Sequence, residues 1–237
     1  DVGQGVTSVQ AALIAEELDI ELDQPDVSFG PPDPVYANTG LGGEFVSYES
    51  YDLSPEAEAA RAQATEWIAS MGMQMTGGSS TVPDSYEKLR MAGAVARETL
   101  KAAASKRTGV AVADLKTEAG TVILPDGTRI PYTDLAAEAA GIAPVENVTL
   151  RDPKDWRLLG KPMQRVDIVA KATGALKFGL DLSLDGMVYA AVRMNPYKGG
   201  KMNGFDAEAA KAMQGVSSVV GINNGIAAIA SNSWYAM

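Results

Sequence analysis

The chain has 237 residues, of which 46% are hydrophobic, and this length suits one large or two modest domains. The 30 acidic residues outnumber the 20 basic ones and give a formal net charge of −10, which disfavours nucleic acid and anionic membrane surfaces as partners. The chain has no cysteine and no histidine, which excludes disulfides, thiolate-bound iron–sulfur clusters, ordinary zinc sites and His-dependent nucleophiles.

The first predicted element is a tight turn that leads into a helix. Gly3 and Gly5 precede an apolar stripe with helical spacing, and the stripe ends near Leu18. Glu16 and Glu17 lie on this helix. A packed or solvated helix acid is the favoured interpretation for both, ahead of a catalytic base.

A loop region with one inserted helix follows. Residues 25–29 alternate as a strand does, and the prolines of 30–34 end that strand because they supply no ladder donor. An exposed loop then runs to about Asp52. Ser54-Pro55-Glu56 has the order that begins a helix, so we expect an inserted surface helix near 54–70.

A second glycine-rich turn, at 76–81, precedes a long helix that starts around Pro83 and Asp84. One part of this helix is rich in small residues that let another backbone approach closely: Ala92, Gly93, Ala94 and Ala96. Beyond it, the segments 115–118, 121–124 and 129–132 predict a small β-meander, and Thr133-Asp134 begins a short helix to Ala140.

The pattern changes near residue 150, where we place a domain boundary. After it we expect strands at 166–169, 178–182 and 187–194, a helix at 205–213, and a closing hairpin of 216–222 with 226–230. The whole chain is therefore predicted to be α+β.

The two glycine-rich turns are the main chemical signal, since a turn before a helix can direct backbone N–H groups and the helix dipole at an anion. The first turn is not a dinucleotide fingerprint, because Ser8 stands where the third glycine belongs, and the second lacks the lysine of a P-loop. An ordinary structural turn remains the alternative for both, and a solvated turn residue the alternative for Gln4. Lys161, Arg165 and Lys171 form a basic group that either contacts a phosphate or is a solvated face; we favour the solvated face.

The motifs resemble those of one family. Asp1-Val-Gly-Gln-Gly5 and Ala15-Glu-Glu-Leu18 resemble a segment of the molybdenum hydroxylases, the xanthine dehydrogenase and aldehyde oxidase superfamily. Thr76-Gly-Gly-Ser-Ser80 and the segment 89–97 resemble the partner segment of the isoquinoline 1-oxidoreductase beta-subunit type. The motifs of 159–190 resemble the opening of the family's hammerhead domain.

The resemblance implies that residues 1–150 are part of a molybdopterin-binding domain, with the inserted helix near 54–70, and that 151–237 are an incomplete hammerhead-like α/β domain. It places the cofactor-binding residues at Gly3, Gln4, Gly5, Gly77, Gly78, Ser79, Ser80 and Thr81. It implies no direct metal ligand and no catalytic residue here, because the family's catalytic glutamate lies far toward the C-terminus.

The resemblance also implies the function of the complete protein. It is an oxidoreductase that hydroxylates an N-heterocycle or oxidises an aldehyde with water-derived oxygen, using molybdenum on molybdopterin in its cytosine dinucleotide form. A small partner subunit holds the iron–sulfur clusters, and a cytochrome c is a further expected electron acceptor. The location implied is bacterial, and periplasmic or membrane-associated.

Both ends of the chain read as cuts, with neither a signal sequence nor an apolar run of roughly 20 residues that could span a membrane. We therefore expect an internal fragment that is inactive alone. Two alternatives stay open: a non-catalytic scaffold, and a module that binds a phosphate-bearing ligand.

Overall fold

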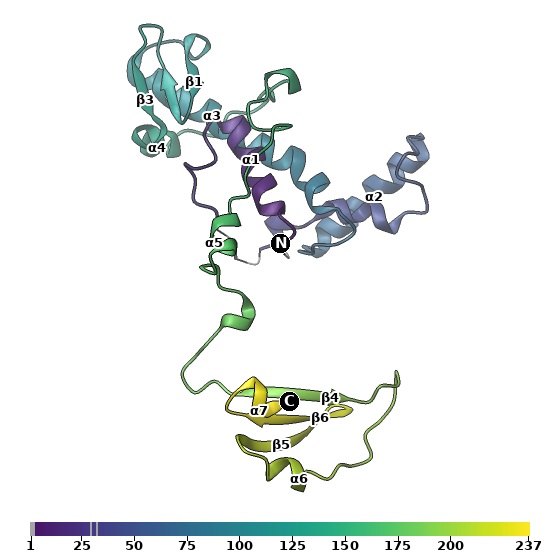
Figure 1. Ribbon diagram of the computed structural model, residues 1–237. Helices are drawn as coiled ribbons and strands as arrows, with labels where there is room; N and C mark the ends of the chain where they lie inside the picture. The colour runs from purple at the N-terminus through teal and green to yellow at the C-terminus, as the bar shows by residue number, and fades with distance from the viewer. Residues whose placement is uncertain (1–2, 29, 32) are drawn as a thin grey trace. The chain divides into compact units, whose positions relative to one another are not determined.

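The computed structural model describes residues 3–28, 30–31 and 33–237, and the chain forms two compact units, Asp1–Ala175 and Leu176–Met237. Helices and small antiparallel sheets build the units (Figure 1), which confirms the predicted α+β class. The domain boundary near residue 150 stays a prediction, although by its contacts the segment 151–175 belongs to the first unit. In the described residues, no helix has both the length and the apolar character needed to cross a membrane.

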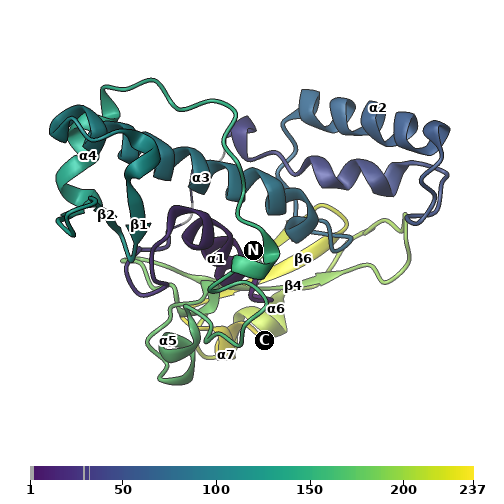
Figure 2. The same ribbon diagram turned by 90° about the horizontal axis from the view of Figure 1, so that it is seen from above.

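The first unit is built on two packed helices, α1 (Val6–Leu18) and α3 (Thr81–Thr108) (Figure 2). Both were predicted, and α3 begins slightly earlier than expected. Gly93 of α3 faces α1 so closely that a Cβ there would lie 2.6 Å from the carbonyl oxygen of Ile14. The expected close approach of a backbone to the small residues of this helix is therefore confirmed.

A small sheet packs against the C-terminal part of α3. Its strands β1 (Lys116–Glu118), β2 (Thr121–Ile123) and β3 (Arg129–Pro131) form an antiparallel meander, followed by α4 (Tyr132–Ala140). A short 3₁₀ helix, η3 (Val112–Asp114), precedes the sheet. The predicted meander and helix are confirmed, and their buried core consists of Ala103, Ala104, Leu115, Val122, Tyr132 and Leu135.

The segment between α1 and α3 forms two 3₁₀ helices, η1 (Pro34–Tyr36) and η2 (Thr39–Phe45), and the predicted inserted helix α2 (Pro55–Met71). The Ser54 side chain accepts the Ala57 N–H at 3.3 Å and caps α2, which packs against η2. The strand predicted at 25–29 is wrong for residues 25–28, which pair with no neighbouring strand; Phe29 lies outside the described residues.

The segment 151–175 returns to the first unit through η4 (Pro153–Asp155) and a short helix, α5 (Ile168–Ala172). The strand predicted at 166–169 is wrong. Asp167 and Lys171 stand four residues apart and their charged groups pair at 2.6 Å, a spacing that supports a helical turn.

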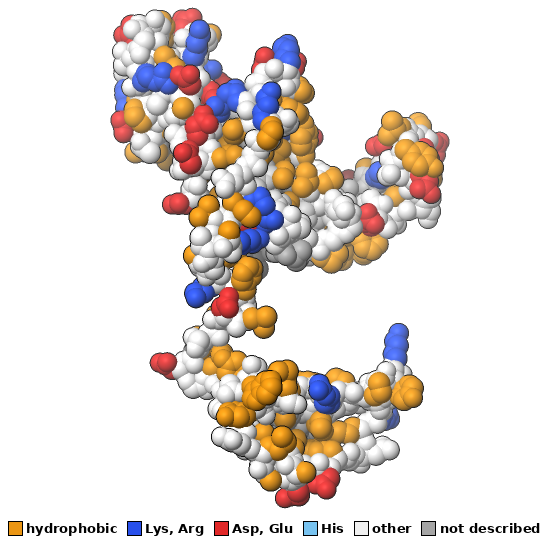
Figure 3. Space-filling model, in the orientation of Figure 1, with side chains coloured by type: hydrophobic (Ala, Val, Ile, Leu, Met, Phe, Trp, Pro, Cys, Tyr) orange, Lys and Arg blue, Asp and Glu red, His pale blue; other side chains and the backbone are white. Residues whose placement is uncertain are grey.

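The second unit is a three-stranded antiparallel sheet with the order β4-β6-β5. Its elements are η5 (Gly179–Asp181), β4 (Tyr189–Met194), α6 (Glu208–Lys211), β5 (Val216–Ile222), β6 (Gly225–Ala230) and α7 (Ser233–Ala236). The predicted hairpin and the strand at 187–194 are confirmed, and the helix predicted at 205–213 is shorter. Apolar side chains gather on the surface of this unit in Figure 3.

The strand predicted at 178–182 in the second unit is wrong. The Asp181 carboxylate accepts the Phe178 N–H at 2.9 Å, and this local bond closes a 3₁₀ turn instead. The side chain thus supplies the acceptor that a neighbouring strand would otherwise provide.

Candidate functional site

The two glycine-rich turns, far apart in the sequence, line one cavity of about 510 Å³. The first turn and α1 contribute Gln4, Gly5, Val6 and Val9, and the second turn and α3 contribute Thr76, Gly77, Ser79, Thr81 and Val82. Five of the eight predicted cofactor-binding residues therefore meet at this cavity. Gly3, Gly78 and Ser80 belong to the same turns but do not line it.

The first turn presents the N-terminal end of α1 to the cavity. Gly3 (φ 86°) and Gly5 (φ 104°) have left-handed backbones that other residues rarely adopt, and Gly5 is the residue before the helix. No side chain caps α1 and its first turn holds no acid. The positive end of the helix dipole is therefore not offset by an acidic side chain of the helix itself.

The second turn is closed by its own serine. Gly78 (φ 54°) and Ser79 (φ 56°) are both left-handed. The buried Ser80 then donates its N–H and its hydroxyl to the carbonyl oxygen of Gly77, at 3.0 and 2.7 Å. Ser80 thus shapes the turn, while Ser79 and Thr81 line the cavity with hydroxyls that can donate or accept hydrogen bonds.

Asn38, which sequence analysis missed, holds the second turn from the inserted segment. Its side chain is 6% exposed, and its amide donates to the Met75 carbonyl at 2.8 Å and to the Ser80 hydroxyl at 2.9 Å. It also lines a second, polar cavity of about 430 Å³ that shares Thr76 and Thr81 with the first. No motif marks Asn38, because its partners lie some forty residues later in the chain.

Two of the basic residues that we favoured as a solvated face contact the first turn. The side chains of Arg165 and Lys171 donate to the Gly3 carbonyl at 3.1 and 3.4 Å. Asp167 binds both cations, and their hydrogen bonds, with Arg165 contributing most, lower the pKa of its carboxyl group to about 2. Asp167 is therefore ionised across the neutral range. Lys161 is exposed and forms no ion pair with the described residues.

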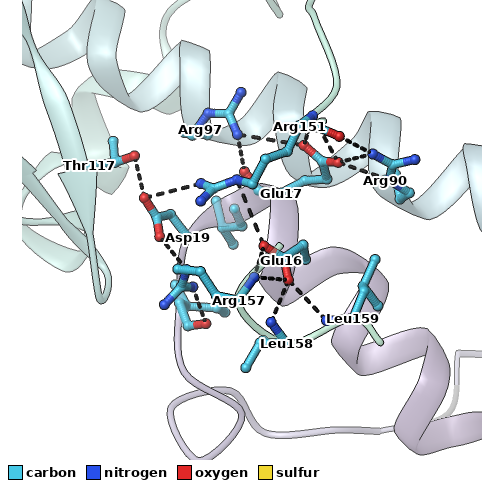
Figure 4. A network of polar contacts seen from close by, with 12 residues as sticks. Glu16, Glu17, Asp19, Arg90, Arg97, Thr117, Arg151, Arg157, Leu158 and Leu159 are labelled. Atoms are coloured by element: carbon cyan, nitrogen blue, oxygen red, sulfur yellow. Dashed lines mark hydrogen bonds and ion pairs between the residues drawn. The ribbon is translucent and has the colours of Figure 1, made fainter. Parts of the chain in front are cut away.

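Glu16 is a structural acid, as we expected. Its side chain is fully buried, and its carboxylate accepts the backbone N–H groups of three successive residues at 3.0, 2.6 and 3.1 Å (Figure 4): Arg157, Leu158 and Leu159. This carboxylate fastens the segment 151–175 to α1.

Glu17 is equally buried and lies among arginines (Figure 4). Its carboxylate pairs with Arg90 at 2.7 Å and accepts the backbone N–H of Arg151 at 3.0 Å, with Arg97 at 3.6 Å. Both carboxylates of α1 are thus used in packing, and neither lines the cavity between the turns. Among the described residues, no group of three or more acids is placed to hold a metal ion.

No family model matches the chain as a whole or in part. The chain is similar, however, to components of curated oxidoreductases over most of its own length. It is 28% identical to the second component of the nicotinate dehydrogenase of Pseudomonas putida and 26% identical to the beta chain of the isoquinoline 1-oxidoreductase of Brevundimonas diminuta, in each case over 97% of this chain. It covers 17% and 30% of those two relatives.

A third relative carries a different cofactor in its name. The chain is 23% identical, over 91% of its length, to the membrane-bound aldehyde dehydrogenase [pyrroloquinoline-quinone] of Gluconacetobacter polyoxogenes, of which it covers 24%. The chain thus spans less than a third of the length of each of these relatives. Two of the names refer to N-heterocycles and one to aldehydes.

Proposed function

We propose that this chain is part of the molybdopterin-binding subunit of a molybdenum hydroxylase, and that the two glycine-rich turns bind one anionic pterin cofactor between them. The observation that carries this proposal is the shared cavity of Gln4 and Ser79. Two turns that were singled out separately, each before a helix, contribute to the same space.

The cavity fits such a group in size and in donors. About 510 Å³ lies within the range of roughly 300–1,000 Å³ that is common for ligand pockets. Gly5 and Gly77 allow close backbone approach, the Gln4 amide can both donate and accept, and Ser79 and Thr81 add hydroxyls. The first turn of α1 has no acid to repel an anion.

The residues of this chain would bind and orient the cofactor. When bound, the cofactor supplies the oxidation of a substrate carbon with oxygen from water. Glu16 and Glu17 take no part in that chemistry, because they are buried in ion pairs and backbone contacts. In this proposal, the catalytic base comes from another part of the complete protein.

The complete enzyme in this proposal acts on an N-heterocycle or an aldehyde, the two substrate classes that the relatives' names contain. It uses the cytosine dinucleotide form of the cofactor. Its iron–sulfur clusters sit on a small partner subunit, since this chain has no cysteine to bind them. A cytochrome c as final acceptor and a periplasmic or membrane-associated location complete the proposal.

The test is the metal content of the complete purified subunit and of two variants. Gln4→Ala removes a side chain that lines the cavity, and we expect it to lower bound molybdenum several-fold with little change in folding. Gln63→Ala, an exposed glutamine of α2, is the matched control and should retain the parent's metal.

Three outcomes would contradict the proposal. A parent protein without molybdenum but with a bound quinone would favour the cofactor named in the third relative. Binding of simple nucleotides without molybdenum would favour a phosphate-binding module, and no ligand at all would favour a scaffold. Equal metal content in Gln4→Ala and Gln63→Ala would exclude Gln4 from the site.

A further inference from the structure

A three-residue ionic cluster fixes the peptide group before Gln4. Arg165 and Lys171 both donate to the Gly3 carbonyl oxygen, and Asp167 holds them by pairing with Arg165 at 3.0 Å and with Lys171 at 2.6 Å. The three side chains are only about a fifth to a third exposed. We call Arg165, Asp167 and Lys171 the carbonyl clamp.

The clamp also sets the direction of the next N–H group. The described chain has no cis peptide bond, so the carbonyl of Gly3 and the N–H of Gln4 point in opposite directions within one planar group. Holding the carbonyl toward the two cations therefore turns the Gln4 N–H away from them. The left-handed Gly3 and Gly5 allow many other backbone orientations, and the clamp selects one of them.

Two more contacts bind the clamp segment to the first turn of α1. The Val166 N–H donates to the buried Ser8 hydroxyl at 3.1 Å. The guanidinium carbon of Arg165 lies 3.4 Å from the point where a Cβ on Gly5 would stand. The segment thus contacts residues on both sides of Gln4 but does not itself line the cavity.

We infer that Asp167 is a positioning residue for the cofactor site: through Arg165 and Lys171 it holds the Gly3 carbonyl and so fixes the backbone and side chain of Gln4 at the cavity. The inference rests on the proposed function only in the assumption that Gln4 contacts the cofactor. The geometry of the clamp is independent of which ligand fills the cavity.

The first measurement is amide hydrogen exchange in the complete subunit, followed by mass spectrometry over residues 3–9. Asp167→Asn removes the charge that organises the clamp, and we expect exchange in this peptide to speed up about tenfold. Asp155→Asn, an exposed acid of the same segment, should leave it unchanged. Asp167→Glu keeps the charge and should restore most of the protection.

The second measurement is a double-mutant cycle on bound molybdenum and pterin. If Asp167 acts through Gln4, Asp167→Asn alone lowers cofactor content several-fold, and adding it to Gln4→Ala lowers the content less than twofold further. A merely structural role would give losses that multiply, because separate sites act additively in free energy.

Each result decides a separate question. Unchanged hydrogen exchange in Asp167→Asn, or losses that multiply, would overturn the clamp. Should Gln4→Ala retain full cofactor, the proposed function would fail, while exchange would still judge the clamp. If Asp167→Asn does not fold, Lys171→Met, which removes only one donor, takes its place with a smaller expected increase in exchange.

Discussion

Glu16→Ala should be among the most destabilising single changes in the first unit. The side chain of Glu16 is fully buried, and its loss leaves three backbone N–H groups at 157–159 without their acceptor. Each buried donor left unpaired costs about 1–3 kcal/mol. Arg151, whose guanidinium lies 3.8 Å from the Glu16 carboxylate, also loses a counter-charge, and breaking a buried ionic contact costs about 3–5 kcal/mol. Because these contributions overlap, we expect a total loss of about 4 kcal/mol.

The assay is thermal unfolding of the whole chain, followed by circular dichroism. At about 2–4 °C per kcal/mol for a unit of this size, the Tm of Glu16→Ala should fall by roughly 10 °C. Glu118→Ala is the control, because its pair with Arg129 is about half exposed and should contribute less than about 1 kcal/mol. A Tm for Glu16→Ala as close to the parent as that of Glu118→Ala would refute the conclusion that this carboxylate fastens the returning segment.

Two further substitutions test the packing around the site. Gly93→Ala should lower the Tm even though alanine favours helices, because its Cβ would lie 2.6 Å from the Ile14 carbonyl oxygen and force α1 and α3 apart, typically at about 1–3 kcal/mol; a raised Tm would show that the helices separate freely. Asn38→Ala should speed hydrogen exchange in residues 76–81, because the Met75 carbonyl and the Ser80 hydroxyl lose their donor at a net cost of about 1–3 kcal/mol, and unchanged exchange there would show that the turn holds itself.

The sequence predicted the elements whose signals are local. Ser54-Pro55 begins α2 because its side-chain cap and fixed φ act within one turn, and the two glycine-rich turns were found because left-handed positions favour glycine. The three wrong strands, at 25–28, 166–169 and 178–182, failed for the complementary reason. Short apolar runs become strands only where a neighbouring strand accepts them, and here local side-chain bonds or a helical turn replaced that neighbour.

The missed residues of the site depend on contacts between distant segments. Arg165 and Lys171 lie some 160 residues after Gly3, and Asn38 reaches its partners about forty residues later. Their residue types are ordinary for a loop or a solvated face, so composition and spacing favoured the wrong interpretation for the two cations. Only the packing of the segment 151–175 on α1 brings them to the turn.

The distribution of charge along α1 explains how an acidic chain can offer an anion-binding site. The acids of this region, Glu16, Glu17 and Asp19, lie at the C-terminal end of the helix, where the dipole repels them, and arginines at 90, 97, 151 and 157 pair with them. The N-terminal end has no acid in its first turn and has Arg165 and Lys171 beside Gly3. The net charge of −10 therefore does not describe the cavity, whose nearest helix end and nearest cations both favour an anion.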